Sequence, residues 1–119
     1  MLINKAQRYC FEVMQMRICS TLHGTKMVIQ ILGEIDHHSA KEIMTSIDER
    51  LQASAPRDCV LDFEKVSFMD SSGIAIILKS YRLLNAAGGR LWIENVPSQP
   101  MRVLDASGIE RLVKISALN

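Results

Sequence analysis

The chain has 119 residues, of which 48% are hydrophobic, and this predicts one globular domain with a substantial core. Fourteen basic and thirteen acidic side chains almost cancel, so the sequence lacks the basic surplus that is typical of nucleic-acid-binding proteins. No apolar run approaches the ~18 residues that a membrane span requires, and no signal-like segment follows the first residue. We therefore expect a cytoplasmic protein whose partners include neither nucleic acid nor membrane.

The first fourteen residues carry no clear pattern, and we assign residues 1–14 to an N-terminal extension that precedes a domain over residues 15–119. Apolar residues alternate from Met16 and predict a strand, followed by a turn at 23–25 and a second strand over 26–32. We expect these two strands to form an antiparallel hairpin.

The next segment, residues 33–38, reads as a loop. Ser39 then resembles a helix N-cap, and Glu42 three residues later completes a capping box. The predicted helix extends to about Ala53, where a Ser-Ala-Pro sequence ends it. Its apolar residues recur every four positions and predict an inward face made of Ile43, Ile47 and Leu51.

The second half of the chain repeats this alternation of strand and helix. Strands are predicted over 59–63, 90–94 and 112–115, and helices over 71–87 and 99–106. The longer helix has a predicted inward stripe of Ile74, Ile77, Leu78, Tyr81 and Leu84. Two β-α-β steps with short connections predict an α/β fold: a mixed, mainly parallel sheet of about four to five strands with helices packed on it.

The stretch from Val60 to Gly73 is the most informative part of the chain. An apolar strand ends near Asp62, and Asp70-Ser71-Ser72-Gly73 opens a strongly apolar helix. A helix N-terminus carries unpaired backbone N–H groups and about half a positive charge, so a phosphate on this turn would be well placed. Taken alone, the same four residues could serve only as a helix cap with a glycine that eases a tight turn.

Several catalytic and binding motifs are missing from the sequence. It contains no G-x-x-x-x-G-K-[ST], no G-x-G-x-x-G and no G-x-S-x-G, so we expect no enzyme activity of its own. Asp36-His37-His38 suggests a metal site at first sight. Adjacent residues of an extended chain point in opposite directions, however, and the sequence offers no third and fourth ligands. We expect no catalytic residues, no metal and no cofactor.

Three segments together resemble the anti-sigma factor antagonists of the STAS domain family, and most of all the sporulation antagonists of endospore-forming bacteria. They are GEIDHHSAKEI at 33–43, SFMDSSGIAIILKSYR at 67–82 and DASGI at 105–109. The resemblance covers roughly residues 16–115 in matching order and spacing. Ala75 stands where many relatives carry glycine, and Lys79 replaces a small residue, so the contact with a partner is expected to differ in detail.

The resemblance implies a STAS fold and a switch that regulates transcription by exchange of partners. The unphosphorylated antagonist binds an anti-sigma factor that is a serine kinase, and the sigma factor is released. The kinase then transfers phosphate from ATP to the first serine of the D-S-S-G motif, here Ser71, and the modified antagonist dissociates. A serine phosphatase restores the unmodified form. ATP enters only as the phosphate donor of the partner kinase.

The resemblance also assigns residues to the partner surface, with Asp36 expected near the phosphoacceptor across the strand ends, the two histidines on the rim and Ile74 as an apolar anchor. The residues are Asp36, His37, His38, Asp70, Ser71, Ser72, Gly73 and Ile74. Two alternatives stay open. One is a STAS scaffold in another signalling complex, in which Ser71 is rarely or never modified. The other is a nucleotide- or lipid-binding STAS domain that uses the helix N-terminus as its ligand site.

Overall fold

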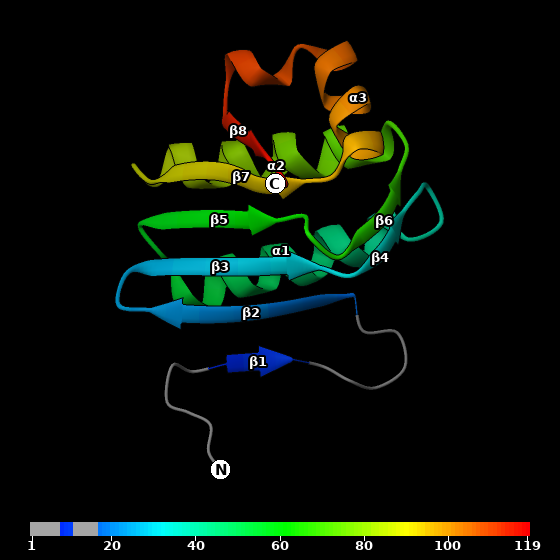
Figure 1. The fold of residues 1–119 in the computed structure, drawn as a ribbon. Helices are drawn as coiled ribbons and strands as arrows, with labels where there is room; N and C mark the ends of the chain where they lie inside the picture. The colour runs from blue at the N-terminus through cyan, green and yellow to red at the C-terminus, as the bar shows by residue number, and fades with distance from the viewer. Residues whose placement is uncertain (1–7, 11–16) are drawn as a thin grey trace.

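The computed structural model describes residues 8–10 and 17–119, and Figure 1 shows their arrangement. Strands and helices alternate along most of this part of the chain, as predicted. In chain order the elements are β1 (Arg8–Cys10), β2 (Ile18–His23), β3 (Lys26–Ile31), β4 (Gly33–Ile35), α1 (Ala40–Ser54), β5 (Asp58–Asp62), β6 (Val66–Met69), α2 (Ser72–Ala86), β7 (Arg90–Val96), α3 (Ser98–Ser107), the short 3₁₀ helix η1 (Ile109–Arg111) and β8 (Lys114–Ala117).

The main sheet has the strand order β1-β2-β3-β5-β7-β8. Strand β2 is antiparallel to both of its neighbours, β1 and β3, whereas β3, β5, β7 and β8 run parallel. The predicted hairpin is confirmed, with Leu22 paired to Met27 across the turn. The predicted fold class is confirmed as well, and the sheet gains a further strand because β1 pairs with β2 at its edge.

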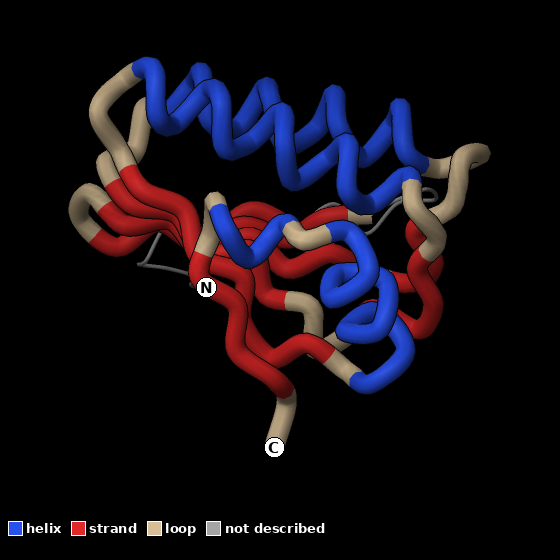
Figure 2. Tube along the Cα trace, turned by 90° about the horizontal axis from the view of Figure 1, so that it is seen from above, coloured by secondary structure: helices blue, strands red, loops and turns tan. Residues whose placement is uncertain are grey.

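Two long helices, α1 and α2, lie side by side on one face of this sheet (Figure 2). The inward face predicted for α1 is confirmed, because Ile43, Ile47 and Leu51 are all buried. These side chains join buried residues of β3 and β5, such as Ile29 and Leu61, in one hydrophobic core. Burial of apolar side chains of this size is the main source of the stability of the fold.

The buried face of α2 is rotated about the helix axis relative to the predicted stripe. Ile77 and Leu84 are buried as expected, but Ile74, Leu78 and Tyr81 are only partly buried. The buried face also includes Ile76, and it admits Ser80, whose hydroxyl donates to the backbone carbonyl of Ile76 at 2.9 Å. A serine whose hydroxyl bonds a carbonyl of its own helix can lie in a core, so the buried face of α2 is not made of apolar residues alone.

The first half of the loop predicted at residues 33–38 is a strand of a second, two-stranded sheet, whereas residues 36–38 form a turn as predicted. Strand β4 runs parallel to β6, and both were missed because they contain only three and four residues. Gly33 pairs with Val66, and after a register shift Ile35 pairs with Met69. This small sheet carries the chain from the main sheet to the N-termini of α1 and α2 (Figure 1).

Three widely spaced cysteines without a C-x-x-C motif predict free thiols, and this prediction is correct for Cys59 and wrong for Cys19. Cys59 is a free, buried thiol on β5, and burial raises its pKa to about 12 because the thiolate would lose its hydration. Cys19 is disulfide-bonded. The prediction rested on the wide spacing of the cysteines, which does not reveal that β1 folds back alongside β2.

The proposed N-terminal extension lies mostly outside the described residues, and its boundary stays a prediction. Within it, Arg8–Cys10 forms the edge strand β1, although the sequence of this segment shows no clear pattern. In the part of the chain that the structure describes, no helix is both long and apolar enough to span a membrane.

Candidate functional site

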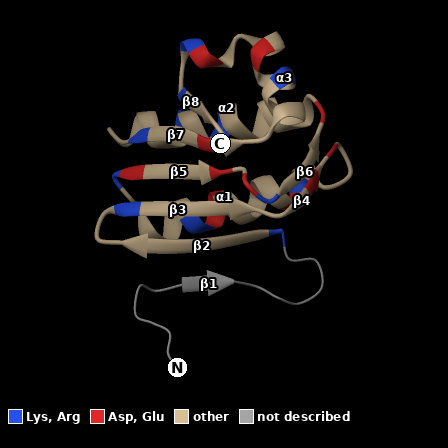
Figure 3. Ribbon diagram, in the orientation of Figure 1, with Lys and Arg blue, Asp and Glu red and all other residues tan. Residues whose placement is uncertain are grey.

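Two polar loops leave neighbouring ends of the small sheet. Strands β4 and β6 are parallel, and their last residues, Ile35 and Met69, are paired. The backbone N–H of Asp70 then donates to the carbonyl of Ile35 at 3.0 Å, which extends the pairing by one step. The loops that begin with Asp36 and Asp70 are therefore held at the same edge, and Figure 3 shows acidic residues on both of them.

Asp36 organises the first loop through its carboxylate. Its Oδ1 accepts the backbone N–H groups of His38 and Ser39, both at 3.0 Å. The pKa of Asp36 lies below its ordinary value. The main cause is the hydrogen bond from the Ser39 N–H, because that bond favours the ionised carboxylate. The side chain predicted to contact a partner thus also closes the turn that leads into α1.

The predicted capping box at Ser39 does not form. The Ser39 hydroxyl makes no capping hydrogen bond to α1 and donates instead to the carbonyl of Glu34 at 3.0 Å. Ser39 is buried, and its Oγ also accepts the N–H of Asp36 at 3.1 Å. Ser39 therefore fastens the loop to β4, and Glu42 lies 4.0 Å from Arg17 in an ion pair.

Asp70 occupies the N-terminus of α2 in a similar way. Its Oδ1 accepts the N–H of Ser72 at 2.8 Å, and its carbonyl accepts the N–H of Gly73 at 3.1 Å. The N–H of Ile74 is bonded to the carbonyl of Ser71 at 3.0 Å. The expected row of unpaired N–H groups at this helix start is therefore already used by the chain itself.

Ser71 is the residue that this arrangement leaves accessible. It is exposed at the N-cap position of α2, and its hydroxyl makes no capping hydrogen bond. The neighbouring Ser72 is half-buried. Because Asp70 has taken over the capping role, the Ser71 hydroxyl can be modified without loss of a hydrogen bond that holds the helix.

Gly73 and Ile74 differ from what their places in the motif suggested. Gly73 is buried against the side chain of Met69, and a Cβ at this position would overlap the Met69 thioether and lie 2.6 Å from its Cγ. The glycine is thus required for packing under the site. Ile74, expected as an apolar anchor, is half-buried and offers only part of its side chain.

The two histidines lie on the outside of the first loop. His37 and His38 are both exposed, with ring centroids 4.0 Å apart. Among the described residues, no group of three or more His, Cys, Asp and Glu side chains is placed to hold a metal ion.

Two residues near the site were not singled out from the sequence. Phe68 on β6 has 42% of its surface exposed, which is unusual for a large aromatic side chain. Gln99 on α3 bonds both backbone groups of Met69: its Oε1 accepts the N–H and its Nε2 donates to the carbonyl, each at 2.9 Å. Strand β6 does not alternate, because Ser67 and Phe68 are both exposed between the buried Val66 and Met69, so no period of two would have placed Phe68 outward. No local signal identifies a glutamine that completes a distant strand either.

Cavities flank Ser71 and Ser72 on two sides. One of about 530 Å³ lies between α2 and α3, and we call it the α2–α3 groove. It is lined by Ser71, Ile74, Gln99, Arg102, Val103, Ala106 and Ser107. A second cavity of about 450 Å³ lies between α1 and α2 and is bordered by His37, Lys79 and Ser72 among others.

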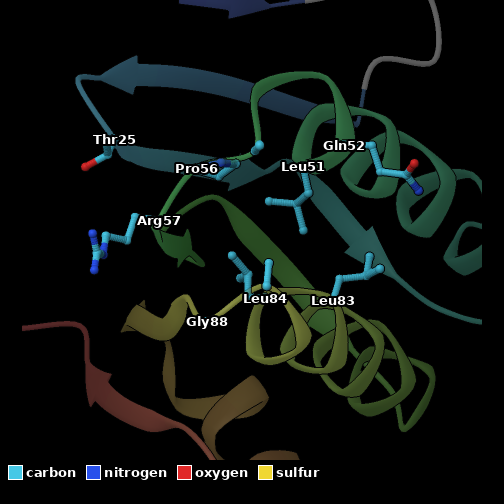
Figure 4. Close-up of a pocket in the computed structure, with 10 residues that line it drawn as sticks. Thr25, Leu51, Gln52, Pro56, Arg57, Leu83, Leu84 and Gly88 are labelled. Atoms are coloured by element: carbon cyan, nitrogen blue, oxygen red, sulfur yellow. The ribbon is translucent and has the colours of Figure 1, made fainter.

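A cavity of about 730 Å³ lies at the other ends of the same helices, near their C-termini (Figure 4). Leu51, Leu83 and Leu84 form its apolar wall, and Arg57 stands at its edge. It shares no lining residue with the cavities beside Ser71 and Ser72. It therefore forms no part of the candidate site.

Comparison with known proteins gives a consistent result. The STAS domain family matches residues 18–117. The chain is 32% identical to the anti-sigma F factor antagonist of Paenibacillus polymyxa over 102 residues, which cover 86% of this chain and 87% of the relative. It is 31% identical to the anti-sigma-B factor antagonist of Bacillus subtilis over 90 residues, which cover 75% of this chain and 80% of the relative.

Solved structures agree with the sequence matches. The unphosphorylated form of the anti-sigma factor antagonist SpoIIAA superposes with a TM-score of 0.71 at 29% identity, covering 82% of this chain and 86% of that one. The phosphorylated form of SpoIIAA from Bacillus gives a TM-score of 0.61 at 28% identity, covering 91% and 89%. The chain therefore belongs to the STAS domain family, in which the relatives that it matches are anti-sigma factor antagonists.

Proposed function

We propose that this protein is an anti-sigma factor antagonist controlled by phosphorylation of Ser71. In its unphosphorylated form it binds an anti-sigma factor that is a serine kinase, and the sigma factor is released. The kinase then modifies Ser71, and a serine phosphatase reverses the modification. The protein itself has no turnover in this scheme and requires no cofactor.

The proposal rests on the hydroxyl of Ser71, which is exposed and takes no part in capping α2. A kinase must reach the hydroxyl from solvent, and Ser71 is exposed at the start of α2. The loop after β4 lies beside it, because Asp70 and Ile35 are hydrogen-bonded. One partner surface can therefore contact the residues from Asp36 to His38 together with those from Asp70 to Ile74. The similarity to named anti-sigma factor antagonists supports this type of partner.

The charge of a phosphate explains how binding would be switched off. Phosphorylation adds about −1.5 to −2 charges at neutral pH. The new charge would stand next to Asp70 and across the edge from Asp36, in the centre of the proposed contact surface. Like-charge crowding and desolvation at an interface can weaken binding by several kcal/mol, which corresponds to roughly a thousandfold change in affinity.

A binding assay tests the proposal. The anti-sigma factor from the same genome is titrated with the unmodified protein and with Ser71→Glu, Ser71→Ala and Ser72→Ala. We expect tight binding by the unmodified protein and by both alanine variants, and at least about hundredfold weaker binding by Ser71→Glu. If Ser71→Glu and Ser72→Ala bind equally well, Ser71 does not control the contact.

A further inference from the structure

We propose that Arg102 on α3 is the intramolecular partner of a phosphate on Ser71, and that the two groups close the α2–α3 groove when the protein is phosphorylated. This inference rests on the proposed modification of Ser71. It adds a residue outside the D-S-S-G motif and a structural description of the modified state.

The first observation concerns the donors at the start of α2. The N–H of Ser72 is bonded to the carboxylate of Asp70, and the N–H groups of Gly73 and Ile74 are bonded to backbone carbonyls. A phosphate on Ser71 therefore finds these donors occupied. It also carries a negative charge beside Asp70, which favours an interaction with a nearby cation on another element.

The second observation is that Arg102 is the single charged residue among those that line the α2–α3 groove with Ser71. Its side chain is exposed, and among the described residues no carboxylate lies within 4.0 Å of its guanidinium. An unpaired guanidinium has a planar set of donors that matches a phosphate.

The other polar groups of the groove already have partners. Gln99 uses both atoms of its amide on Met69, and the Ser107 hydroxyl donates to the carbonyl of Leu104 at 2.7 Å. Of the polar side chains that line the groove, the Ser71 hydroxyl and the Arg102 guanidinium make no hydrogen bond or ion pair within the described residues. Because Gln99 fixes α3 to the end of β6, Arg102 is held at the groove rather than brought there by a movement of the helix.

The consequence is a change in the surface offered to a partner. A phosphate–guanidinium pair that crosses the groove would cover the exposed part of Ile74, which borders it. Phosphorylation would then remove an apolar contact and an available positive charge, in addition to introducing a negative charge at the loop.

The test uses protein with phosphoserine incorporated at position 71 by genetic code expansion, so that it does not depend on any kinase. The second ionisation of the phosphate is followed by ³¹P NMR in the otherwise unmodified chain and in Arg102→Gln, Arg102→Lys and Arg82→Gln. Arg82 is an exposed control, eleven residues further along the chain than Ser71 and thus about 16 Å away along α2.

We expect the pKa of the phosphate to be higher in Arg102→Gln than in the parent by about half a unit, a threefold change in its acid constant. Arg102→Lys should recover part of this difference, Arg82→Gln should leave the pKa unchanged, and high salt should reduce the effect. The other titratable side chains of the loop after β4, of the start of α2 and of α3, which are Asp36, His37, His38, Asp70 and Asp105, are the same in all variants.

An unchanged pKa in Arg102→Gln would overturn the inference. Circular dichroism of each variant serves as the check that the fold is intact. If the pKa shifts as expected but the anti-sigma factor kinase never modifies Ser71, the proposed function fails while the Arg102 contact stands. The two proposals can therefore be rejected separately.

Discussion

The side chain of Gln99 pairs with the backbone of Met69 as a neighbouring strand would. Its amide accepts the Met69 N–H and donates to the Met69 carbonyl, both at 2.9 Å. Met69 is the last residue of β6, and Asp70 and Ser71 follow it directly. One side chain thus fastens α3 to the segment that presents Ser71, the proposed phosphoacceptor.

Replacement of Gln99 by alanine should destabilise the protein and loosen the site. Two hydrogen bonds to a part-buried backbone are lost, so we expect a decrease of about 1–3 kcal/mol in the free energy of unfolding in urea. The Met69 amide should also exchange faster with solvent. Gln52→Ala is the matched control, because Gln52 is exposed and its amide donates only to the side chain of Asp48. Equal stability of the two variants would contradict the role given to Gln99.

Gly73→Ala should reduce stability although alanine favours helices. The propensity gain is about 1 kcal/mol at most, whereas overlap with the buried Met69 side chain is expected to cost about 1–3 kcal/mol. Ala75→Gly, at an exposed position of the same helix, measures the propensity effect alone. Urea denaturation compares the three proteins, and a Gly73→Ala variant more stable than the parent would show that Met69 moves aside.

The carboxylate of Asp36 should make a pH-dependent contribution to stability. Its folded pKa lies below the ordinary value of 3.8, so its contribution is present above that pH and is lost as the pH falls through the folded pKa. The difference in unfolding free energy between the parent and Asp36→Asn should therefore shrink in acid. Asp105→Asn, which replaces an exposed carboxylate on α3, is the control. A difference that grows as the pH falls would mean that the Asp36 bonds do not favour the ionised form.

Burial of Cys59 predicts the opposite dependence at alkaline pH. Its folded pKa of about 12 exceeds the ordinary value of 9.0, so the unfolded chain releases the proton first as the pH rises. The stability that this group confers is complete below pH 9.0 and is lost progressively up to about pH 12. One pH unit above 9.0, the free energy of unfolding should be lower by about 1 kcal/mol than at neutral pH. This decrease should be absent in Cys59→Ala. Rapid labelling of native Cys59 by a thiol reagent at neutral pH would contradict the burial.

Much of the architecture follows from periodicity, and the exceptions have physical causes. The spacing of Ile43, Ile47 and Leu51 is enough to predict which face of α1 is buried, because every fourth residue of a helix returns to one side. Strands β4 and β6 are too short to show any period. Each strand is stabilised by the other and by the elements around it, so the sequence of either strand alone does not reveal it.

The site could be predicted in outline only. The two loop motifs identify Asp36 and Ser71, but not that Asp70 caps α2 and frees the Ser71 hydroxyl. Likewise Ser39 has the sequence context of an N-cap, yet it bonds backward to Glu34 because β4 brings that carbonyl close. The roles of Gln99 and Arg102 depend on the packing of α3, which lies about thirty residues away in sequence from Met69 and Ser71.

Phosphopeptide mapping tests the central claim most directly. The protein is incubated with ATP and the anti-sigma factor kinase from its own genome, digested and analysed by mass spectrometry, with Ser71→Ala treated in parallel. We predict one phosphate on the peptide that contains Ser71, none on Ser71→Ala, and loss of kinase binding by the modified protein. A Ser71→Ala variant phosphorylated to the same extent, or an unmodified Ser71 in a complex that persists with ATP, would contradict the account.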